Sequence, residues 1–312
     1  MLVALALDLL LGDPPNRAHP VAWMGRALAL GRRALCRGGA TRLLVGGALA
    51  TLAVTALAAL AGGAVSLLAG RLGALAPVVE GAALWLLLSV RGLVRAAREV
   101  AAALAAGELD AARAAVGRHL VSRSTVTLSE SEVASATVES VAENLTDALV
   151  APVFFYLLLG LPGAAAYRAL NTADAMIGYR EGPLEYFGKL AARLDDVLNV
   201  IPARLAALGI VAAAGFTGGD ARGAWRALRR DGGRTTSPNA GRTMAAMAGA
   251  LGVALTKPGA YRLGAGRSPA AADVARALRV FAGAAVVSVG ALLLLDSVVF
   301  FLRGGRRALG II

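Results

Sequence analysis

Long apolar runs separated by polar segments dominate the pattern of the chain. Residues 43–70 contain no charged side chain, and residues 280–302 contain only Asp296. Both runs exceed the roughly 20 residues that a membrane-spanning helix requires. The pattern predicts an all-α, polytopic integral membrane protein with four or five spans. Three weaker candidate spans carry an internal charge or proline, at residues 72–90, 149–167 and 197–217.

The polar segments suggest how the rest of the chain is organised. Residues 91–147 show apolar positions at helical spacing and are predicted to form a polar, cytoplasmic helical insertion. Residues 218–279 are predicted to be a second polar segment of loop and helix. Without an internal repeat, the whole chain, residues 1–312, is expected to form a single membrane-embedded domain.

The topology is not settled by counting apolar runs. If every candidate crossed once, the polar segments 168–196 and 218–279 could not both be cytoplasmic, although Arg-rich segments favour that side. We therefore expect one of the runs 149–167 and 197–217 to be a reentrant or tilted helix buried in protein, which its proline or arginine would suit.

Composition agrees with a membrane protein and argues against other classes. The 312 residues are 57% hydrophobic, which is more apolar than is usual for a soluble domain of this length. A net charge of +12 would suit nucleic acid, but only 5% of residues are aromatic and the interleaving typical of such binders is missing. The positive-inside rule explains the charge instead. The single Cys36 excludes an intramolecular disulfide.

An unusual acidic segment, "SESEVASATVESVAENLTD" at 129–147, precedes the run 149–167. On a helix, Glu132, Glu139, Glu143 and Asp147 fall within an arc of roughly 80°. Like charges at this spacing destabilise a helix, so the ladder is either a solvated face or a site neutralised by cations. Because Glu143 and Asp147 adjoin an apolar run, unpaired carboxylates would be costly there. Oxygen ligands without Cys or His clusters favour Mg²⁺, with phosphate bound as well.

A second polar constellation follows the same apolar run. Asn171 and Asp174 share a helix face, and Asp195 and Asp196 each lie within one turn of Asn199. Carboxylates combined with the planar guanidinium of arginine would suit a Mg²⁺-bound phosphate substrate, whereas salt bridges between helices are the alternative. The interspersed arginines are Arg168, Arg180, Arg193 and Arg204.

Two loops complete the candidate chemistry. The proline-stiffened segment 12–26 presents Asp13, His19 and Arg26, although a lone histidine is more often structural than catalytic. In segment 230–242, Ser237 is predicted to cap a helix with Pro238 at its first position. The free N–H groups of that helix would bind an anion, or the capping role alone explains the Ser-Pro pair.

Four stretches also carry a resemblance to a known family. They are "LDLLLGDPPNRAHPVAWMGR", "TVESVAENLTDALVAPVFFYLLLGLPGAAAYRALNTADAMIGYR", "FGKLAARLDDVLNVIPARL" and "SPNAGRTMAAMAGALGV". With these stretches the chain resembles the cobalamin biosynthesis CobD/CbiB family, the membrane-bound adenosylcobinamide-phosphate synthases, over most of its length apart from 43–110. It departs from that family's pattern at Ser124, at "RTT" before the SPNAG sequence, and at Arg242.

The resemblance implies a reaction and its components. The family joins a carboxylate of adenosylcobyric acid to the amine of aminopropanol phosphate, or a related amino alcohol, and gives adenosylcobinamide phosphate. The reaction is assigned as dependent on ATP and Mg²⁺. A multi-pass protein of the cell inner membrane is implied, with the lipid bilayer, a homo-oligomer or other late cobalamin enzymes as partners, and no nucleic acid.

Amide formation from a carboxylate requires activation, such as an acyl phosphate, and a base that frees the amine. We therefore assign roles as follows. Catalysis is assigned to Asp13, His19, Asp195 and Asp196; Mg²⁺ binding to Glu132, Glu139, Glu143, Asp147 and Asp174; and substrate or phosphate binding to Arg26, Asn144, Arg168, Asn171, Arg180, Asn199, Arg204, Ser237 and Asn239.

Two other functions fit parts of the pattern. An intramembrane prenyltransferase also combines Asn- and Asp-rich helices with Mg²⁺ and a diphosphate, but such enzymes usually show two Asp-rich motifs and more spans. A non-catalytic scaffold or transporter of the corrinoid pathway is the other alternative. Transporters place polar residues inside broken spans, whereas here most polar residues lie in the segments between runs.

Overall fold

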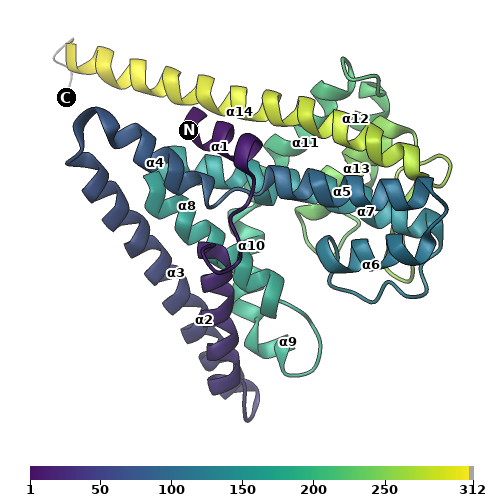
Figure 1. Ribbon diagram of the computed structural model, residues 1–312, viewed down its shortest axis with the longest axis horizontal. Helices are drawn as coiled ribbons and strands as arrows, with labels where there is room; N and C mark the ends of the chain where they lie inside the picture. The colour runs from purple at the N-terminus through teal and green to yellow at the C-terminus, as the bar shows by residue number, and fades with distance from the viewer. Residues whose placement is uncertain (309–312) are drawn as a thin grey trace.

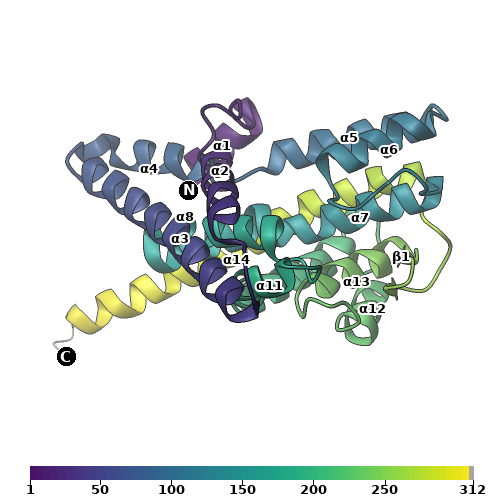
Figure 2. The same cartoon turned by 90° about the horizontal axis from the view of Figure 1, so that it is seen from below.

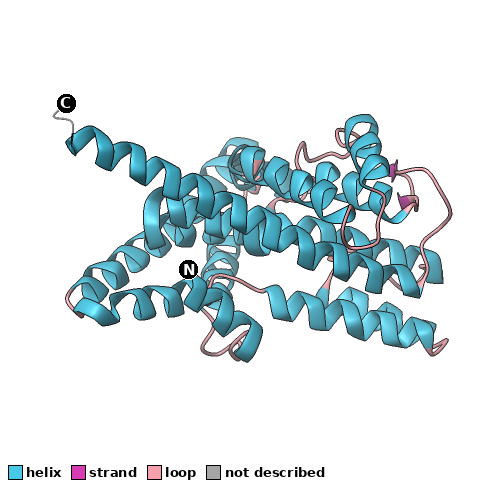
Figure 3. Ribbon diagram, turned by 90° about the horizontal axis from the view of Figure 1, so that it is seen from above, coloured by secondary structure: helices cyan, strands magenta, loops and turns pink. Residues whose placement is uncertain are grey.

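The computed structural model describes residues 1–308, and nearly all of their regular structure is helical (Figure 1). One antiparallel hairpin of two short strands is the only sheet within that range (Figure 3), so the predicted all-α class is confirmed. In chain order the elements are α1 (Leu2–Leu11), α2 (Pro20–Leu35), α3 (Ala40–Gly70), the 3₁₀ turn η1 (Gly73–Leu75), α4 (Ala76–Trp85), α5 (Val90–Ala105), α6 (Leu109–His119), α7 (Glu130–Leu145), the π-helical turn η2 (Thr146–Val150), α8 (Ala151–Ile177), α9 (Leu184–Phe187), α10 (Lys189–Leu198), α11 (Val200–Ala214), α12 (Ala221–Asp231), α13 (Ala240–Leu251), β1 (Leu255–Lys257), β2 (Tyr261–Leu263) and α14 (Ala271–Ala308).

Several helical stretches are long and apolar enough to cross a membrane, judged by length and composition. Helices α10 and α11, bent by 51° at Asn199, add one more if the pair counts as a single broken span. The prediction of four or five spans is therefore confirmed, and the bend lies in the run 197–217, one of the two runs expected to be reentrant or tilted. The four long stretches are Ala40–Gly70, Gly73–Ala105, Glu130–Ile177 and Ala271–Val298.

The acidic segment and the apolar run after it form one helical path. Helix α7, the turn η2 and helix α8 follow one another without a loop, so the run predicted at 149–167 begins inside a longer helical stretch. The path bends within α8, where Gly160 has a φ of 69° that glycine adopts without steric penalty. Pro162 follows and cannot donate a backbone hydrogen bond, which adds to the kink.

The helices divide the molecule into two ends joined by the long α14. Helices α3 and α4 lie at one end, and α5, α6, α12 and α13 lie at the other (Figures 1 and 2). Leu57, Leu60 and Leu67 of α3 are between 64% and 76% exposed on a helix with only one charged residue. Such an apolar outer surface is typical of a helix that faces lipid. By contrast, α7 is buried along most of its length, against α5, α13 and α14.

A glycine allows the close approach of α3 to α8. A Cβ atom at Gly62 would lie 2.9 Å from the carbonyl oxygen of Leu161 and 3.0 Å from the nitrogen of Pro162. Both are backbone atoms, which cannot rotate away from the added methyl group. Small residues at helix interfaces serve the same purpose in other membrane proteins.

We expect Gly62→Ala to destabilise the protein, because the methyl group overpacks this contact at a cost of about 1–3 kcal/mol. Gly63→Ala is the matched control, since its added Cβ has its nearest neighbour 3.8 Å away, at Pro162 Cγ. Thermal unfolding of both variants in detergent measures the difference. Equal melting temperatures for the two variants would contradict the close approach.

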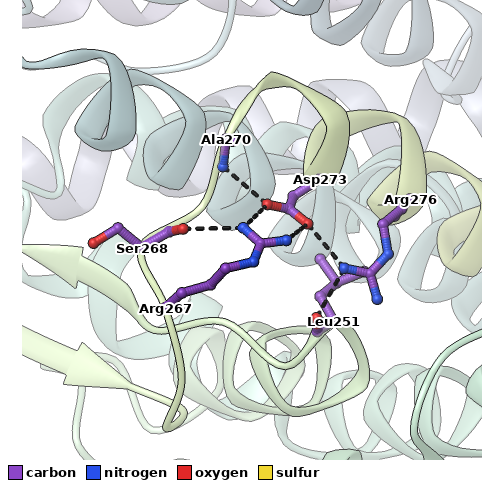
Figure 4. A network of polar contacts seen from close by, with 6 residues as sticks. All are labelled: Leu251, Arg267, Ser268, Ala270, Asp273 and Arg276. Atoms are coloured by element: carbon purple, nitrogen blue, oxygen red, sulfur yellow. Dashed lines mark hydrogen bonds and ion pairs between the residues drawn. The ribbon is translucent and has the colours of Figure 1, made fainter.

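A buried carboxylate fixes the start of α14 (Figure 4). Asp273 has no exposed surface and accepts hydrogen bonds from both terminal nitrogens of Arg267, at 2.6 and 2.8 Å, and from Arg276 at 2.9 Å. It also accepts from the backbone N–H of Ala270, and Arg276 donates to the carbonyl oxygen of Leu251. These bonds join the first turn of α14 to the end of α13.

Asp273→Asn removes the charge that holds the two arginines, and we expect a loss of about 1–3 kcal/mol in the free energy of unfolding. Asp220→Asn is the control, because Asp220 is an exposed N-cap and asparagine caps helices equally well. Chemical denaturation in detergent measures both. A loss of stability at Asp273 no larger than at Asp220 would show that the hydrogen bonds of Asp273 to the two arginines contribute nothing to stability.

Candidate active site

The four acidic side chains predicted to share one helix face have different surroundings. Glu132 lies exposed at the start of α7, where it closes a capping box with Ser129: the Ser129 N–H donates to Glu132 at 2.8 Å. This bond occupies one oxygen of the Glu132 carboxylate, at a helix start where the side chain is not buried as Glu139 is. The capping role of Glu132 could not be read from periodicity on α7, and its predicted Mg²⁺-binding role stays a prediction.

Glu139 is buried and bound to the hairpin. Its two carboxylate oxygens accept from the hydroxyls of Ser135 and Tyr261, both at 2.8 Å. Burial, followed by the charge of Glu139, raises the pKa of Tyr261, so the phenol keeps the proton that it donates. Ser135 also accepts from the N–H of Thr256, which ties α7 to β1. Glu139 thus helps to attach the hairpin to α7, and it also lies near Glu143.

Glu143 and Asp147 reach a small polar cavity. The carboxylate of Glu143 lines it from α7, and Asp147 lines it from the π-helical turn η2. π-helical turns are rare and often occur at functional sites. The cavity has a volume of about 20 Å³, which is room for one particle the size of water or a metal ion. Its other lining residues are Thr146, Asp195, Asn199, Ala203, Ser237, Asn239, Ala240 and Thr243.

Asp195 enters this cavity from α10, and two amides orient it. Its Oδ1 accepts from Asn171 of α8 at 3.2 Å, and its Oδ2 accepts from Asn199 at 3.0 Å. The Oδ1 atom of Asn199 accepts in turn from the hydroxyl of Tyr167 at 2.9 Å, and Tyr167 lies 3.3 Å from Asp147. The two acidic constellations of the sequence therefore meet, through a tyrosine that the sequence did not single out.

Asp196 connects α10 to the SPNAG loop, residues 237–241. Its Oδ1 accepts from the Ser237 hydroxyl at 3.0 Å, and its backbone oxygen accepts from the Asn239 amide at 2.6 Å. The other Asn239 side-chain atom, Oδ1, accepts from Arg204 at 3.3 Å. The loop that sequence analysis paired with an anion is thereby held beside the acidic cavity.

The helix after this loop starts later than predicted. Helix α13 begins at Ala240 with Asn239 as its N-cap, so Pro238 is outside the helix and Ser237 is not the cap. Ser237 instead accepts from the N–H of Asn239, and Thr235 accepts from the N–H of Gly241. Two of the N–H groups expected to be free are therefore already bonded, which weakens the anion prediction for this helix end.

The N-terminal loop presents an ionised carboxylate. Burial raises the pKa of Asp13, but the neighbouring His19 and the hydrogen bond from Ser89 outweigh it and hold that pKa below its ordinary value. The Ser89 hydroxyl donates to Asp13 at 2.8 Å. His19 Nδ1 accepts from the N–H of Val21 and caps α2, so its remaining nitrogen, Nε2, faces Asp13 at 3.9 Å. Both nitrogens of His19 thus have structural neighbours.

Arg168 links this loop to the acidic cavity. Its positive charge acts on Asp13, and its terminal nitrogen donates to the backbone oxygen of Asp147 at 3.2 Å and lies 3.5 Å from Asn171. The Nε atom of Arg168 is buried and has no hydrogen-bond partner among the described residues, as is true of the Thr146 hydroxyl. Buried polar groups of this kind normally have a partner, so they indicate binding capacity at the site.

The remaining predicted residues lie further out. Asp174 on α8 is close enough to Asp195, Asp196 and Glu143 for their charges to act on it. Asn144 donates back to Ser140 on its own helix. Arg26 and Arg180 are exposed, with no hydrogen bond or ion pair among the described residues. Their phosphate-binding roles remain predictions.

Several site residues were missed by sequence analysis. Tyr167 and Tyr261 belong to stretches that appear apolar or loop-like, and their partners are distant in the chain: 122 residues separate Tyr261 from Glu139. Lys257 at the end of β1 is near enough for its charge to act on Glu139 and Glu143. Thr146 lies inside the acidic segment, directly before Asp147, but was given no role there.

The donor set suits a hard divalent cation. Among the described residues, no three or more His, Cys, Asp or Glu side chains form a ready-made metal cage. Mg²⁺, however, commonly keeps several waters and uses one or two carboxylates with substrate phosphates. Glu143, Asp147 and Asp195, with the unpartnered hydroxyl of Thr146, match that preference for oxygen.

Tyr167→Phe tests the hydrogen bonds that hold the cavity. Loss of the hydroxyl leaves Asn199 Oδ1 buried without its donor, and we expect about 1–3 kcal/mol of lost stability. Tyr179→Phe is the control, because its hydroxyl bonds to a backbone oxygen at the surface. Thermal unfolding in detergent compares them; similar melting temperatures for the two variants would argue against a rigid Tyr167–Asn199 contact.

Comparison with known proteins agrees with this arrangement of motifs. A profile of the family described as "CobD/Cbib protein" matches residues 1–281. "Cobalamin biosynthesis protein CobD" of Dehalococcoides mccartyi is 43% identical over 264 residues, covering 84% of this chain and 85% of the relative. A protein of the same name from Chromobacterium violaceum is 41% identical over 287 residues, covering 89% and 90%.

An archaeal relative is equally similar. The "Probable cobalamin biosynthesis protein CobD" of Methanothermobacter thermautotrophicus is 44% identical over 264 residues, covering 85% of this chain and 86% of the relative. No solved structure matches the chain. The family match covers α7, η2, α10, α11 and the SPNAG loop with the start of α13, which supply the residues that line the cavity. The chain therefore belongs to the CobD/CbiB family of cobalamin biosynthesis proteins.

Proposed function

We propose that this protein is an adenosylcobinamide-phosphate synthase of the cell inner membrane. It ligates a carboxylate of adenosylcobyric acid to the amine of aminopropanol phosphate, or a related amino alcohol, with ATP and Mg²⁺. The family supports a role in cobalamin biosynthesis. The observation that carries the finer proposal is the cavity in which carboxylates of α7, η2 and α10 meet the SPNAG loop.

The reaction needs a phosphate leaving group. In this proposal a carboxylate oxygen of the corrinoid attacks the γ-phosphorus of ATP, and ADP departs. The amine nitrogen then attacks the acyl carbon, the C–O bond to phosphate breaks, and inorganic phosphate leaves while the amine loses a proton. The protein must therefore bind anions, keep them in place and accept one proton.

Glu143, Asp147 and Asp195 are the residues that would hold Mg²⁺. When bound, the ion would offset negative charge on phosphate oxygens. The hydrogen bonds from Asn171 and Asn199 orient Asp195 before any substrate binds. Arg168, which bonds to the Asp147 backbone and whose Nε has no partner among the described residues, is suited to a carboxylate or phosphate oxygen.

Asp196 is the best-placed base among the predicted catalytic residues. Ser237 occupies one of its oxygens, which leaves Oδ2 without a hydrogen bond in the described structure. Asp195 accepts through both oxygens, and His19 uses Nδ1 to cap α2 and directs Nε2 toward Asp13. Asp13 has a pKa below its ordinary value and is therefore a weak proton acceptor, better suited to orient His19.

The test is a product assay on purified protein in detergent. Wild type is incubated with adenosylcobyric acid, aminopropanol phosphate, ATP and Mg²⁺, and the amide is detected by mass spectrometry. We expect Glu143→Gln to lower the rate about a hundredfold or more, because it removes a charge at the cavity. We expect Glu132→Gln on the same helix to retain activity, since glutamine also completes a capping box.

Removal of the metal is a second, independent test of the proposed activity. EDTA is expected to abolish product formation and added Mg²⁺ to restore it. No amide from folded wild type would overturn the proposed activity and favour the scaffold alternative. Equal loss at Glu132 and Glu143 would keep the activity but reject the cavity as its location. Incubation with a prenyl diphosphate separates the prenyltransferase alternative.

A further inference from the structure

A second pocket adjoins the SPNAG loop, and it is lined by basic side chains where the first cavity is lined by acidic ones. It is formed by α11, α12, the loop after α12 and the start of α13, and its volume is about 720 Å³. That size is typical of a small-molecule site. Five arginines line it together with Trp225: Arg204, Arg229, Arg230, Arg234 and Arg242.

One buried carboxylate neutralises only part of this charge. Asp231 has no exposed surface and pairs with Arg230 at 2.6 Å and with Arg234 at 3.1 Å. It also accepts from the N–H of Gly264, so its position is fixed. Asp231 therefore holds two guanidinium groups in place at the pocket wall.

The other three arginines have no carboxylate at ion-pair distance among the residues that the structure describes. Arg204 donates to the backbone oxygen of Val200 and to Asn239, and Arg242 donates to the backbone oxygen of Pro238. These acceptors are neutral, and the charges of Arg204 and Arg242 oppose each other. Like charges gathered around a cavity are unfavourable unless an anion occupies it.

We propose that this pocket binds the phosphate groups of an anionic ligand, and that a nucleoside triphosphate is the class that fits it best. Arginines present paired N–H donors that match phosphate oxygens. The Trp225 side chain, 44% exposed at the pocket, supplies a flat surface on which a base can stack. The phosphate of an anionic lipid headgroup is the other source of the same chemistry.

The position of the pocket connects it with the proposed ligation. Asn239 lines the acidic cavity and accepts from Arg204, which lines the basic pocket, and Arg242 lies one helical turn further along α13. A triphosphate in the basic pocket would therefore lie next to the acidic cavity. In naming a nucleotide the inference rests on the proposed function, whereas the binding of phosphate groups does not depend on it.

The experiment measures binding without catalysis. Purified full-length protein in neutral detergent with EDTA is titrated with ATP and, separately, with inorganic tripolyphosphate, and calorimetry gives the affinities. Arg229→Ala and Arg242→Ala are each expected to weaken binding of both ligands about tenfold, the loss of one charge-assisted contact. Arg222→Ala is the matched control: it is an exposed arginine on α12 outside the pocket, and its effect is expected to stay within about twofold.

A lipid arm distinguishes the sources of phosphate. The protein is placed in nanodiscs of phosphatidylcholine with or without phosphatidylglycerol, and retained lipid is counted by mass spectrometry. Retention of phosphatidylglycerol that depends on Arg229 and Arg242, without binding of ATP or tripolyphosphate, would keep the phosphate site and assign it to lipid. Trp225→Ala is expected to weaken the binding of ATP but not that of tripolyphosphate. An equal loss of affinity for both ligands would show that Trp225 does not stack on a base.

Two results would overturn the inference. One is the absence of binding by ATP, tripolyphosphate and anionic lipid in protein whose unfolding transition is intact. The other is a loss of phosphate affinity in Arg222→Ala equal to that in the pocket variants, because the loss would then follow from the net charge of the protein and not from the pocket. Failure of the proposed function is recognised separately, because missing amide product with intact ATP binding rejects the ligation and leaves this site standing.

Discussion

The need to stabilise carboxylates inside an apolar helical molecule governs this structure. A carboxylate removed from water is costly unless donors surround it, and the chain meets that cost in different ways. Asp273 is held by two arginines and begins α14, whereas Asp195 is held by two neutral amides. The arginines neutralise the charge of Asp273, whereas the amides only orient the carboxylate of Asp195. An oriented carboxylate whose charge is not already paired with an arginine is what a cation-binding or catalytic site requires.

The same requirement explains why α10 and α11 do not form one straight helix. Asn199 lies at the 51° bend, where its amide donates to Asp195 and its oxygen accepts from Tyr167. The bend places Asp195 against α8 and Asp196 against the SPNAG loop. Irregular backbone in an apolar helical protein is tolerated where protein surrounds it, and here the surrounding side chains supply the hydrogen bonds.

The sequence predicted those features that depend on local pattern. Lengths of apolar runs predicted the number of candidate spans, and the roles assigned to Glu143, Asp195 and Asn239 belonged to one reaction, whose residues the structure brings to one cavity. It could not separate Glu132 from Glu143, because helical periodicity does not include tertiary partners. Tyr167 was missed because a tyrosine in an apolar helix gives no sign of its hydrogen bonds. The start of α13 was misplaced because Ser237 bonds to Asp196, a contact between distant segments.

Asn239 has a consequence for how the two neighbouring pockets communicate. Its amide nitrogen bonds to the Asp196 backbone on the acidic side, and its oxygen accepts from Arg204 on the basic side. A ligand that draws Arg204 away changes the bonding of a side chain in the wall of the other cavity. By thermodynamic reciprocity, occupancy of the acidic cavity must change the affinity of the basic pocket by the same factor. One amide side chain would then couple the affinities of two chemically different ligands.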